Sequence, residues 1–274
     1  MREISINGER RGIDEASILV SDASVRYGDI LFETIRVVRG RPYLIDRHLA
    51  RLRRSIEMLG YPSLEEALLS RSIDAMITVA GTASGRLRVS TTRGDLPHTP
   101  PTLIAEFTSF DEIPPIPLPL ELIVHPSPLQ APVLPFKPKG PGYATELRIL
   151  EEVRRVGYHE CLRLTTEGFV GEGCLSNIFW HAGGVLHTPS TTLGVLPGIM
   201  RERIIEIATE EGVRCEIGAW NAAQLAYADE IFMTNALRGI MPVRRIVDLV
   251  DLSDAEGEWS RRLSSRVTAE AGEA

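Results

Sequence analysis

Residues 112–135 read EIPPIPLPLELIVHPSPLQAPVLP, and this proline-rich stretch decides how the chain is divided. Proline lacks a backbone N–H and has a fixed φ, so such a density forbids a helix and disfavours a central strand. One short strand is expected within it, at residues 120–124. We therefore expect a small domain at residues 1–111, an interdomain linker at 112–119 and a larger domain at 120–274.

Strand and helix patterns lie on both sides of this stretch. The helix expected after its cap Asp46 has apolar residues at helical spacing and Gly60 after its last turn. Strands and helices are interleaved without a steady βαβ alternation, so we predict an α+β fold with a small N-terminal α/β domain and a larger strand-rich C-terminal domain. The expected strands are 3–6, 30–38, 43–45, 85–92, 102–108, 120–124, 160–165, 168–171, 176–181, 185–188 and 230–234, and the expected helices are 46–59, 63–79, 144–156, 199–211, 221–227 and 253–270.

The composition excludes several classes of protein. Of 274 residues, 43% are apolar, which is enough for a folded core. The net charge of −7 argues against a nucleic-acid or anionic-membrane surface. The sequence has no apolar run long enough to span a bilayer and no apolar stretch at its N-terminus. We therefore expect no membrane segment, no secretory signal and a cytoplasmic location.

The cysteines and histidines indicate no metal site. Cys161, Cys174 and Cys215 form an odd set without metal-ligand spacing, which favours free thiols in a reducing compartment. The six histidines show no paired spacing either. We therefore expect no bound metal.

The basic residues are unevenly divided between lysine and arginine. Of 30 such residues only two are lysines, Lys137 and Lys139, and both lie in PFKPKGPGY at 135–143. A buried lysine can lose its proton and form a Schiff base, whereas the guanidinium of arginine stays charged. The clustering favours a catalytic amine in this segment, and the alternative is that the two lysines are adjacent by chance.

Three further segments carry charge where a binding site is conceivable. A helix beginning at Gly198 presents free N–H groups that suit an anion, although most helix starts bind only water. In ARLRR at 50–54, Arg51 and Arg54 share a face, for which the ordinary alternative is a solvated surface. Glu172 lies between two glycines in an apolar stretch, where a carboxylate is costly unless a donor meets it; the alternative is an exposed turn.

Taken together, these segments resemble the class IV aminotransferase family of fold type IV pyridoxal-phosphate enzymes. That family includes D-amino-acid transaminases, branched-chain aminotransferases and aminodeoxychorismate lyases. The resemblance extends over nearly the whole chain and implies the two-domain fold of that type, pyridoxal 5'-phosphate as cofactor and a homodimer. The matching stretches are YGDILFETIRV (27–37), DRHLARL (46–52), Lys139 with GYHECLRL (157–164), EGCLSNIFW (172–180) with TPSTTLGVLPGIMR (188–201), and FMTNALRGIMPVRRI (232–246).

The resemblance implies a role for each residue that matches a family motif. Lys139 is the expected catalytic residue and carries the cofactor as a Schiff base; Lys137 fits the family spacing worse, by two residues. Glu172 is expected at the pyridine nitrogen, where its charge makes the ring an electron sink. The other expected cofactor residues are Tyr143 at the phenolic oxygen, Asn177 beside Glu172, Leu196 against the ring, and Arg51, Gly198, Ile199, Met200, Asn235 and Ala236 at the phosphate.

A substrate carboxylate in a mostly apolar pocket needs a paired cation or several donors. In the expected strand at 85–92, alternation directs Leu87 and Val89 toward the core of the small domain, so Arg88 faces the other side. We therefore expect Arg88 to bind this carboxylate, with Arg36 as the second candidate. The expected substrate residues are Tyr27, Phe32, Arg36, Arg88 and His98.

Two activities and one inactive alternative remain open. The first is a transaminase acting between an amino donor, of the D-amino-acid or branched-chain type, and a 2-oxo acid acceptor. The second is aminodeoxychorismate lyase, which releases pyruvate to give 4-aminobenzoate. TNALRG at 234–239 and FETIR at 32–36 resemble lyase motifs, and Met200 and Ala236 stand where branched-chain enzymes carry threonine. The third is a non-catalytic cofactor-binding paralogue, against which the retained Lys139 argues.

Overall fold

The computed structural model describes residues 2–95, 97–130, 134–252 and 256–272. The described residues of 2–114 and 138–143 form one compact unit, and those of 115–137 and 144–270 form a second. The two lysines therefore belong to different units, Lys139 to the first and Lys137 to the second. The linker expected at 112–119 stays a prediction.

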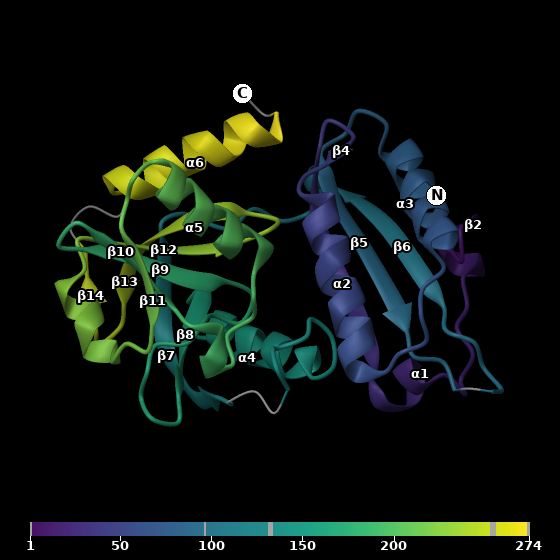
Figure 1. Ribbon diagram of the computed structural model, residues 1–274, viewed down its shortest axis with the longest axis horizontal. Helices are drawn as coiled ribbons and strands as arrows, with labels where there is room; N and C mark the ends of the chain where they lie inside the picture. The colour runs from purple at the N-terminus through teal and green to yellow at the C-terminus, as the bar shows by residue number, and fades with distance from the viewer. Residues whose placement is uncertain (1, 96, 131–133, 253–255, 273–274) are drawn as a thin grey trace. The chain divides into compact units, whose positions relative to one another are not determined.

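The first unit is a six-stranded antiparallel sheet with two helices on one face (Figure 1). Helices α2 (Ile45–Leu59) and α3 (Glu66–Ala80) pack their apolar residues against this face, and the short helix α1 (Ala23–Tyr27) precedes the third strand. The sheet order is β2 (Glu9–Gly12), β1 (Glu3–Ile6), β6 (Leu103–Ser109), β5 (Gly85–Thr92), β3 (Ile30–Val38) and β4 (Arg41–Pro42).

The two faces of this sheet differ as the alternation predicted. Leu87 and Val89 of β5 are fully buried in the core beneath α2 and α3. Arg88 lies opposite Thr34 of β3, and Phe32 of β3 lies opposite Ser90. Cross-strand partners share a face, so these side chains lie on the face away from the helices. The expected orientation of Arg88 is confirmed.

The second unit is built on a larger, mixed sheet. Its core includes Leu122, Ile178, Trp180 and Met233, all buried. Helices α4 (Tyr143–Arg155), α5 (Ile199–Glu210) and α6 (Glu258–Ala271) accompany the sheet (Figure 1). The strand order is β11 (Cys215–Gly218), β10 (Val185–Pro189), β9 (Asn177–Ala182), β12 (Glu230–Asn235), β13 (Gly239–Ile246), β7 (Leu120–Leu129) and β8 (Glu160–Thr165), with β14 (Val250–Asp251) beside β13.

Several expected boundaries were wrong. The hairpin partner expected at 43–45 lies earlier, at Arg41–Pro42, because the turn needs only Arg39 and Gly40, both with positive φ. Leu44, not Asp46, precedes helix α2, with a φ of 55°. The strand expected at 168–171 is reduced to isolated bridges, and the helix expected at 221–227 is a 3₁₀ helix, Ala222–Tyr227. The expected start of the last helix at Ser253 lies outside the described residues.

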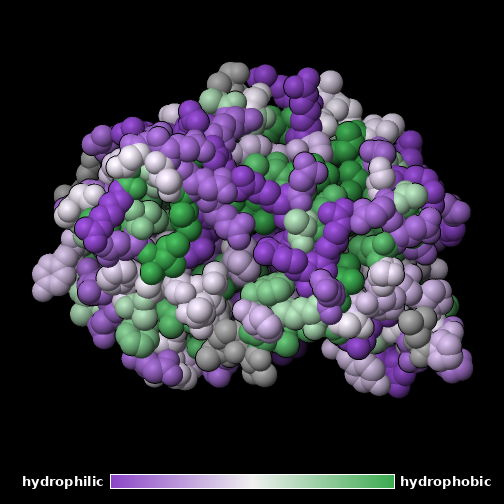
Figure 2. Space-filling model, viewed as in Figure 1, coloured by the Kyte–Doolittle hydropathy of each residue, from purple (hydrophilic) through white to green (hydrophobic). Residues whose placement is uncertain are grey.

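The predicted α+β class is confirmed by the two sheets and their helices. Figure 2 shows hydrophilic and hydrophobic residues intermixed over the face in view. Within the described ranges, no helix is both long enough and apolar enough to cross a lipid bilayer.

Candidate active site

The segment that carries Lys139 lies directly against strand β3 of the first unit. The backbone N–H of Phe32 donates a hydrogen bond of 3.0 Å to the carbonyl of Lys139. Gly140 permits this approach, because a Cβ at that position would overlap the carbonyl oxygen of Ile30. The backbone of the lysine segment is therefore fixed beside Phe32.

Four predicted residues meet at the ring of Phe32. The centroid of this ring is 3.8 Å from Cζ of Arg88 and 4.9 Å from Nζ of Lys139. The ring of Tyr143 packs edge-on at 4.7 Å between centroids, and its own centroid is 4.7 Å from Nζ of Lys139. Aromatic ring faces attract cations. The first unit therefore brings together the predicted Schiff-base lysine, its tyrosine and the predicted carboxylate-binding arginine.

Arg88 is suited to receive an anion. It is partly buried on β5, opposite Thr34 and Glu106 in the two neighbouring strands. Burial lowers the pKa of its guanidinium more than Glu106 raises it, but an arginine still carries its charge at neutral pH. In the part of the chain that the structure describes, its nitrogens donate no hydrogen bond. Its donors are therefore available to a carboxylate.

A buried ionic cluster lies on the opposite face of β3. Glu33 accepts hydrogen bonds from Nε and Nη2 of Arg51, at 2.9 and 2.6 Å, and lies 2.7 Å from Nδ1 of His48. Burial alone raises the pKa of Glu33, but Arg51 and His48 outweigh it and lower this pKa to about 2. Burial lowers the pKa of His48 more than Glu33 raises it, so the ring is neutral at pH 7.

This cluster fixes the guanidinium of Arg51, which the sequence analysis had assigned to a phosphate. The alternative of a solvated cationic face is wrong for Arg51, which is only 2% exposed. Neither Glu33 nor His48 was predicted as a site residue from the sequence. The signal for Glu33 was its position between Leu31 and Ile35 on the buried face of a strand, where a carboxylate requires partners.

The other predicted substrate residues have different surroundings. Tyr27 is 71% exposed, with the guanidinium of Arg26 5.1 Å from its ring centroid. His98 is exposed in the turn between Asp95 and Thr99. Arg36 lies over the ring of Phe110, with Cζ 5.5 Å from its centroid.

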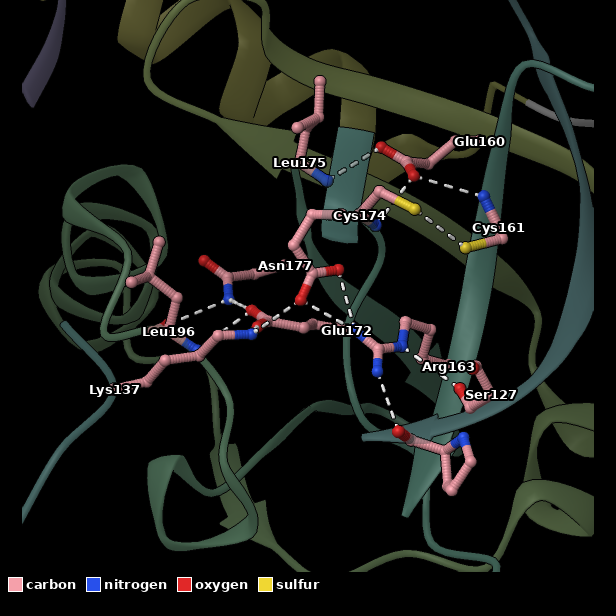
Figure 3. A network of polar contacts seen from close by, with 12 residues as sticks. Ser127, Lys137, Glu160, Cys161, Arg163, Glu172, Cys174, Leu175, Asn177 and Leu196 are labelled. Carbon is pink, nitrogen blue, oxygen red and sulfur yellow. Dashed lines mark hydrogen bonds and ion pairs between the residues drawn. The ribbon is translucent and has the colours of Figure 1, made fainter. Parts of the chain in front are cut away.

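In the second unit, Glu160 holds the loop that carries Glu172 (Figure 3). Its carboxylate accepts hydrogen bonds from the backbone N–H groups of Cys161, Cys174 and Leu175 and from the hydroxyl of Ser176. Several donors on one buried carboxylate make its displacement costly. Glu160 therefore determines the path of residues 174–176, directly after Glu172.

Glu172 is 4% exposed and accepts three hydrogen bonds (Figure 3). Oε2 receives the side-chain amide of Asn177 and the backbone N–H of Leu196, both at 3.0 Å, and Oε1 receives Nζ of Lys137 at 2.9 Å. A carboxylate has about four lone-pair directions, so Oε1 can accept one further donor. The alternative of an exposed turn glutamate is wrong for this residue.

Lys137 links Glu172 to a second ion pair. Its Nζ lies 3.4 Å from Oε1 of Glu146, and Glu146 accepts two bonds of 2.7 Å from Nη1 of Arg163. Arg163 also donates to the carbonyls of Ser127 and Pro128 (Figure 3). Burial lowers the pKa of Lys137, but Glu172 and Glu146 raise it by more. Lys137 is therefore a firmly protonated ammonium.

The helix start that was expected to bind an anion belongs to α5. Gly198 is the N-cap, and among the described residues no side chain caps this turn. The backbone N–H groups of Ile199 and Met200 therefore have no partner within the helix. Gly198 has to be glycine, because a Cβ would overlap Oδ1 of Asn177. Asn177 thus contacts both Glu172 and this helix start.

The second predicted phosphate loop is a tight turn between β12 and β13. Oδ1 of Asn235 accepts hydrogen bonds from the backbone N–H groups of Leu237 and Arg238, at 3.1 and 2.8 Å. Nδ2 of Asn235 donates to the hydroxyl of Ser176 at 3.2 Å, which ties this turn to the loop after Glu172. Ala236 stands within the turn.

Among the described residues of the second unit, Glu160, Cys161 and Cys174 form a cluster of metal-ligating types. Ligand atoms of Glu160, Cys161 and Cys174 lie within 4.8 Å of one another, and the two sulfurs are 3.2 Å apart. Both carboxylate oxygens of Glu160 already accept hydrogen bonds. The cluster therefore offers a metal two buried thiols and no unoccupied carboxylate.

Residues 30–246 match the sequence profile of the family described as amino-transferase class IV. The chain belongs to this family. Its enzymes use pyridoxal 5'-phosphate. Within the class IV family, the chain is 30% identical over 271 residues to the aminodeoxychorismate lyase of Bacillus subtilis (strain 168), covering 95% of this chain and 92% of that protein.

Aminotransferases of the class IV family are similar to the same degree. A branched-chain-amino-acid aminotransferase of Salmonella typhimurium is 29% identical over 266 residues, covering 89% of this chain and 84% of its own. The solved structure of the branched-chain amino acid aminotransferase from Escherichia coli superposes with a TM-score of 0.88 at 26% identity, covering 100% of this chain and 95% of that one. The class IV resemblance and its fold are therefore confirmed.

Proposed function

We propose that this chain is a pyridoxal-phosphate-dependent transaminase that moves an amino group between an amino acid, of the D-amino-acid or branched-chain type, and a 2-oxo acid. The observation that carries the proposal is the shared contact of Lys139 and Arg88 with the ring of Phe32. An amine for the cofactor and a cation for a carboxylate are the two groups that an amino-acid substrate requires.

The described residues fit the cofactor. Glu172 is a buried carboxylate with one acceptor direction left on Oε1, which suits a protonated ring nitrogen. The uncapped start of α5 suits a phosphate. When bound, pyridoxal 5'-phosphate supplies an electron sink for a negative charge that develops on the substrate carbon.

The residues of this chain have separate roles in binding the cofactor and moving the proton. Nζ of Lys139 holds the cofactor and then moves the proton at the substrate α-carbon. Tyr143 would donate to the phenolic oxygen of the cofactor, and Leu196 would pack against its ring. Asn177 and the N–H of Leu196 keep Glu172 oriented. Ile199 and Met200 donate backbone N–H groups to the phosphate, together with the turn at Asn235 and Ala236.

The choice of Lys139 over Lys137 is supported by their surroundings. The nucleophile has to lose its proton to form a Schiff base. The ammonium of Lys137 is paired with two carboxylates that raise its pKa, which opposes that loss. Lys139 contacts the rings of Phe32 and Tyr143, and it fits the family spacing better than Lys137.

A lyase is the second candidate. It is favoured by the 30% identity to the Bacillus subtilis aminodeoxychorismate lyase over nearly the whole chain. The same residues would serve it, with Lys139 taking the ring proton of aminodeoxychorismate while pyruvate leaves. As implied by the family, we propose that either enzyme works as a homodimer, which sedimentation would test.

The deciding experiment is a set of absorption spectra of the cofactor-loaded protein. D-alanine, D-glutamate, L-leucine and an (R)-amine are added in turn, and a transaminase converts the aldehyde band to the amine band with its own donor. Pyruvate released from aminodeoxychorismate, without such conversion, would establish the lyase. If the protein binds the cofactor but carries out neither reaction, the non-catalytic paralogue is the remaining alternative.

A further inference from the structure

Four side chains of alternating charge form a continuous row in the second unit. The row runs from Arg163 through Glu146 and Lys137 to Glu172, with contacts of 2.7, 3.4 and 2.9 Å; Arg163, Lys137 and Glu172 are labelled in Figure 3. Glu172, at its end, is buried, and Arg163, at its start, is fixed by two backbone carbonyls. The family roles assign nothing to Lys137, Glu146 or Arg163.

The row of charges lowers the free energy required to bury the carboxylate of Glu172. Removal of a carboxylate from water favours its neutral form unless charges or donors compensate. Asn177 and Leu196 give Glu172 two neutral donors, both on Oε2. In the described part of the chain, Lys137 is the cation that hydrogen-bonds Glu172. Arg201 interacts with Glu172 electrostatically at longer range, and its Nη2 donates to the carbonyl of Pro189.

The arrangement also orients the carboxylate. The two donors on Oε2 and the single ammonium on Oε1 leave one direction on Oε1. A lysine suits this position, since an ammonium is a point charge, whereas the fork of an arginine engages both oxygens of a carboxylate. In a chain with 30 basic residues, a lysine stands here.

We propose that Lys137 is a positioning residue that keeps the carboxylate of Glu172 turned to accept the N–H of the cofactor ring. The inference rests on the proposed function, in which Glu172 meets the ring nitrogen. Glu146 holds Lys137 at that place, and Arg163 holds Glu146. Lys137 itself forms no bond to the cofactor and does not replace Lys139 as the nucleophile.

The test compares two ligands that differ at one ring atom. Pyridoxal 5'-phosphate and its 1-deaza analogue, with C–H in place of the ring nitrogen, are titrated into cofactor-free protein. In the wild type we expect the natural cofactor to bind about tenfold more tightly, as a charge-assisted hydrogen bond supplies. Lys137→Met should reduce this ratio about threefold or more, because the carboxylate of Glu172 loses the ammonium that orients it toward the ring nitrogen.

The controls separate positioning from folding. Arg155→Met removes an exposed cation of the same unit, paired with Glu151, and should leave the ratio unchanged. Lys137→Gln serves if Lys137→Met fails to give a cooperative melting transition. An unchanged ratio, or equal weakening of both ligands, in the folded variant would overturn the role of Lys137. Failure of the wild type to bind pyridoxal 5'-phosphate, or to prefer it over the analogue, would instead overturn the proposed function and the inference with it.

Discussion

Two cations of the first unit, Lys139 and Arg88, lie against aromatic rings, whereas Lys137 of the second unit is paired with carboxylates. Lys139 and Arg88 contact Phe32, and Lys139 also contacts Tyr143. Two residues before Lys139 in the sequence, Lys137 bridges Glu172 and Glu146. An aromatic ring attracts a cation but carries no net negative charge. A carboxylate carries one and so stabilises the protonated state of a lysine directly. The surroundings of the two lysines, and not the residue type, therefore give them different roles.

The largest expected effect separates the two lysines. Lys139→Ala should abolish both turnover and the absorption band near the violet edge, because the Schiff base is lost. Lys137→Ala should keep the band. The measurement is an absorption spectrum of each purified variant with pyridoxal 5'-phosphate. The opposite result would shift the assignment by two residues and make Lys137 the nucleophile.

The buried cluster of the first unit should be sensitive to loss of its carboxylate. Glu33→Gln leaves the charge of Arg51 buried without its anion, so we expect the free energy of unfolding to fall by about 3–5 kcal/mol. Denaturant unfolding measures this loss. Arg53→Met, which breaks the exposed pair of Arg53 with Glu66, should change stability by less than about 1 kcal/mol. Equal effects would mean that the Glu33 cluster contributes no more than a surface pair.

The same cluster predicts a loss of stability in acid. The pKa of Glu33 falls from 4.5 to about 2 on folding, so its contribution is fully present above pH 4.5 and is lost as the pH falls toward 2. The loss amounts to about 3 kcal/mol. His48, whose pKa is also lowered, begins to oppose folding as the pH falls below 6.5. Unfolding measured from pH 7 to pH 2 tests this, and an equally steep loss in Glu33→Gln would remove Glu33 as its cause.

The carboxylate of Glu172 should matter more for turnover than for the stability of the fold. Glu172→Gln keeps the size and removes the charge, and we expect kcat to fall about 100-fold or more, as for loss of one preorganised electrostatic partner. Cofactor binding should weaken less, since the phosphate is held elsewhere. Steady-state kinetics with the amino donor that the spectra identify measures kcat, and titration of cofactor-free protein measures cofactor binding. Near-normal turnover would reduce Glu172 to a structural residue.

The smallest expected effect concerns Arg88. Arg88→Ala should raise KM for amino acids about tenfold or more, as expected for loss of a charge-assisted hydrogen bond worth about 1.5–3 kcal/mol. An amine without a carboxylate should be spared. Arg86→Ala is the matched control on the same strand, because Arg86 pairs with Glu106 and Thr108. Equal losses for both kinds of substrate would make Arg88 structural.

Much of the fold was readable from local pattern. The strand at Ile30–Val38, the strand at Gly85–Thr92 and the helix ending before Gly60 agree with the expected bounds, because their apolar periodicity coincides with the buried faces. Boundaries failed where the backbone departs from common propensity. Leu44 precedes helix α2 with a positive φ, which a bulky apolar residue rarely adopts, and Asp46 had the better capping chemistry.

The sequence by itself determined the α+β class, the family resemblance and the candidate residues, since each of these depends on order and spacing along the chain. Only the tertiary structure decided which charges meet. Glu33 and Arg51 are 18 residues apart in sequence, and Lys137 and Glu172 are 35 apart. An ion pair depends on distances of a few ångströms, and the strength of its electrostatic interaction depends on burial. No local pattern carries either quantity, so the partners of Glu172 and Arg51 became visible only when the chain was folded.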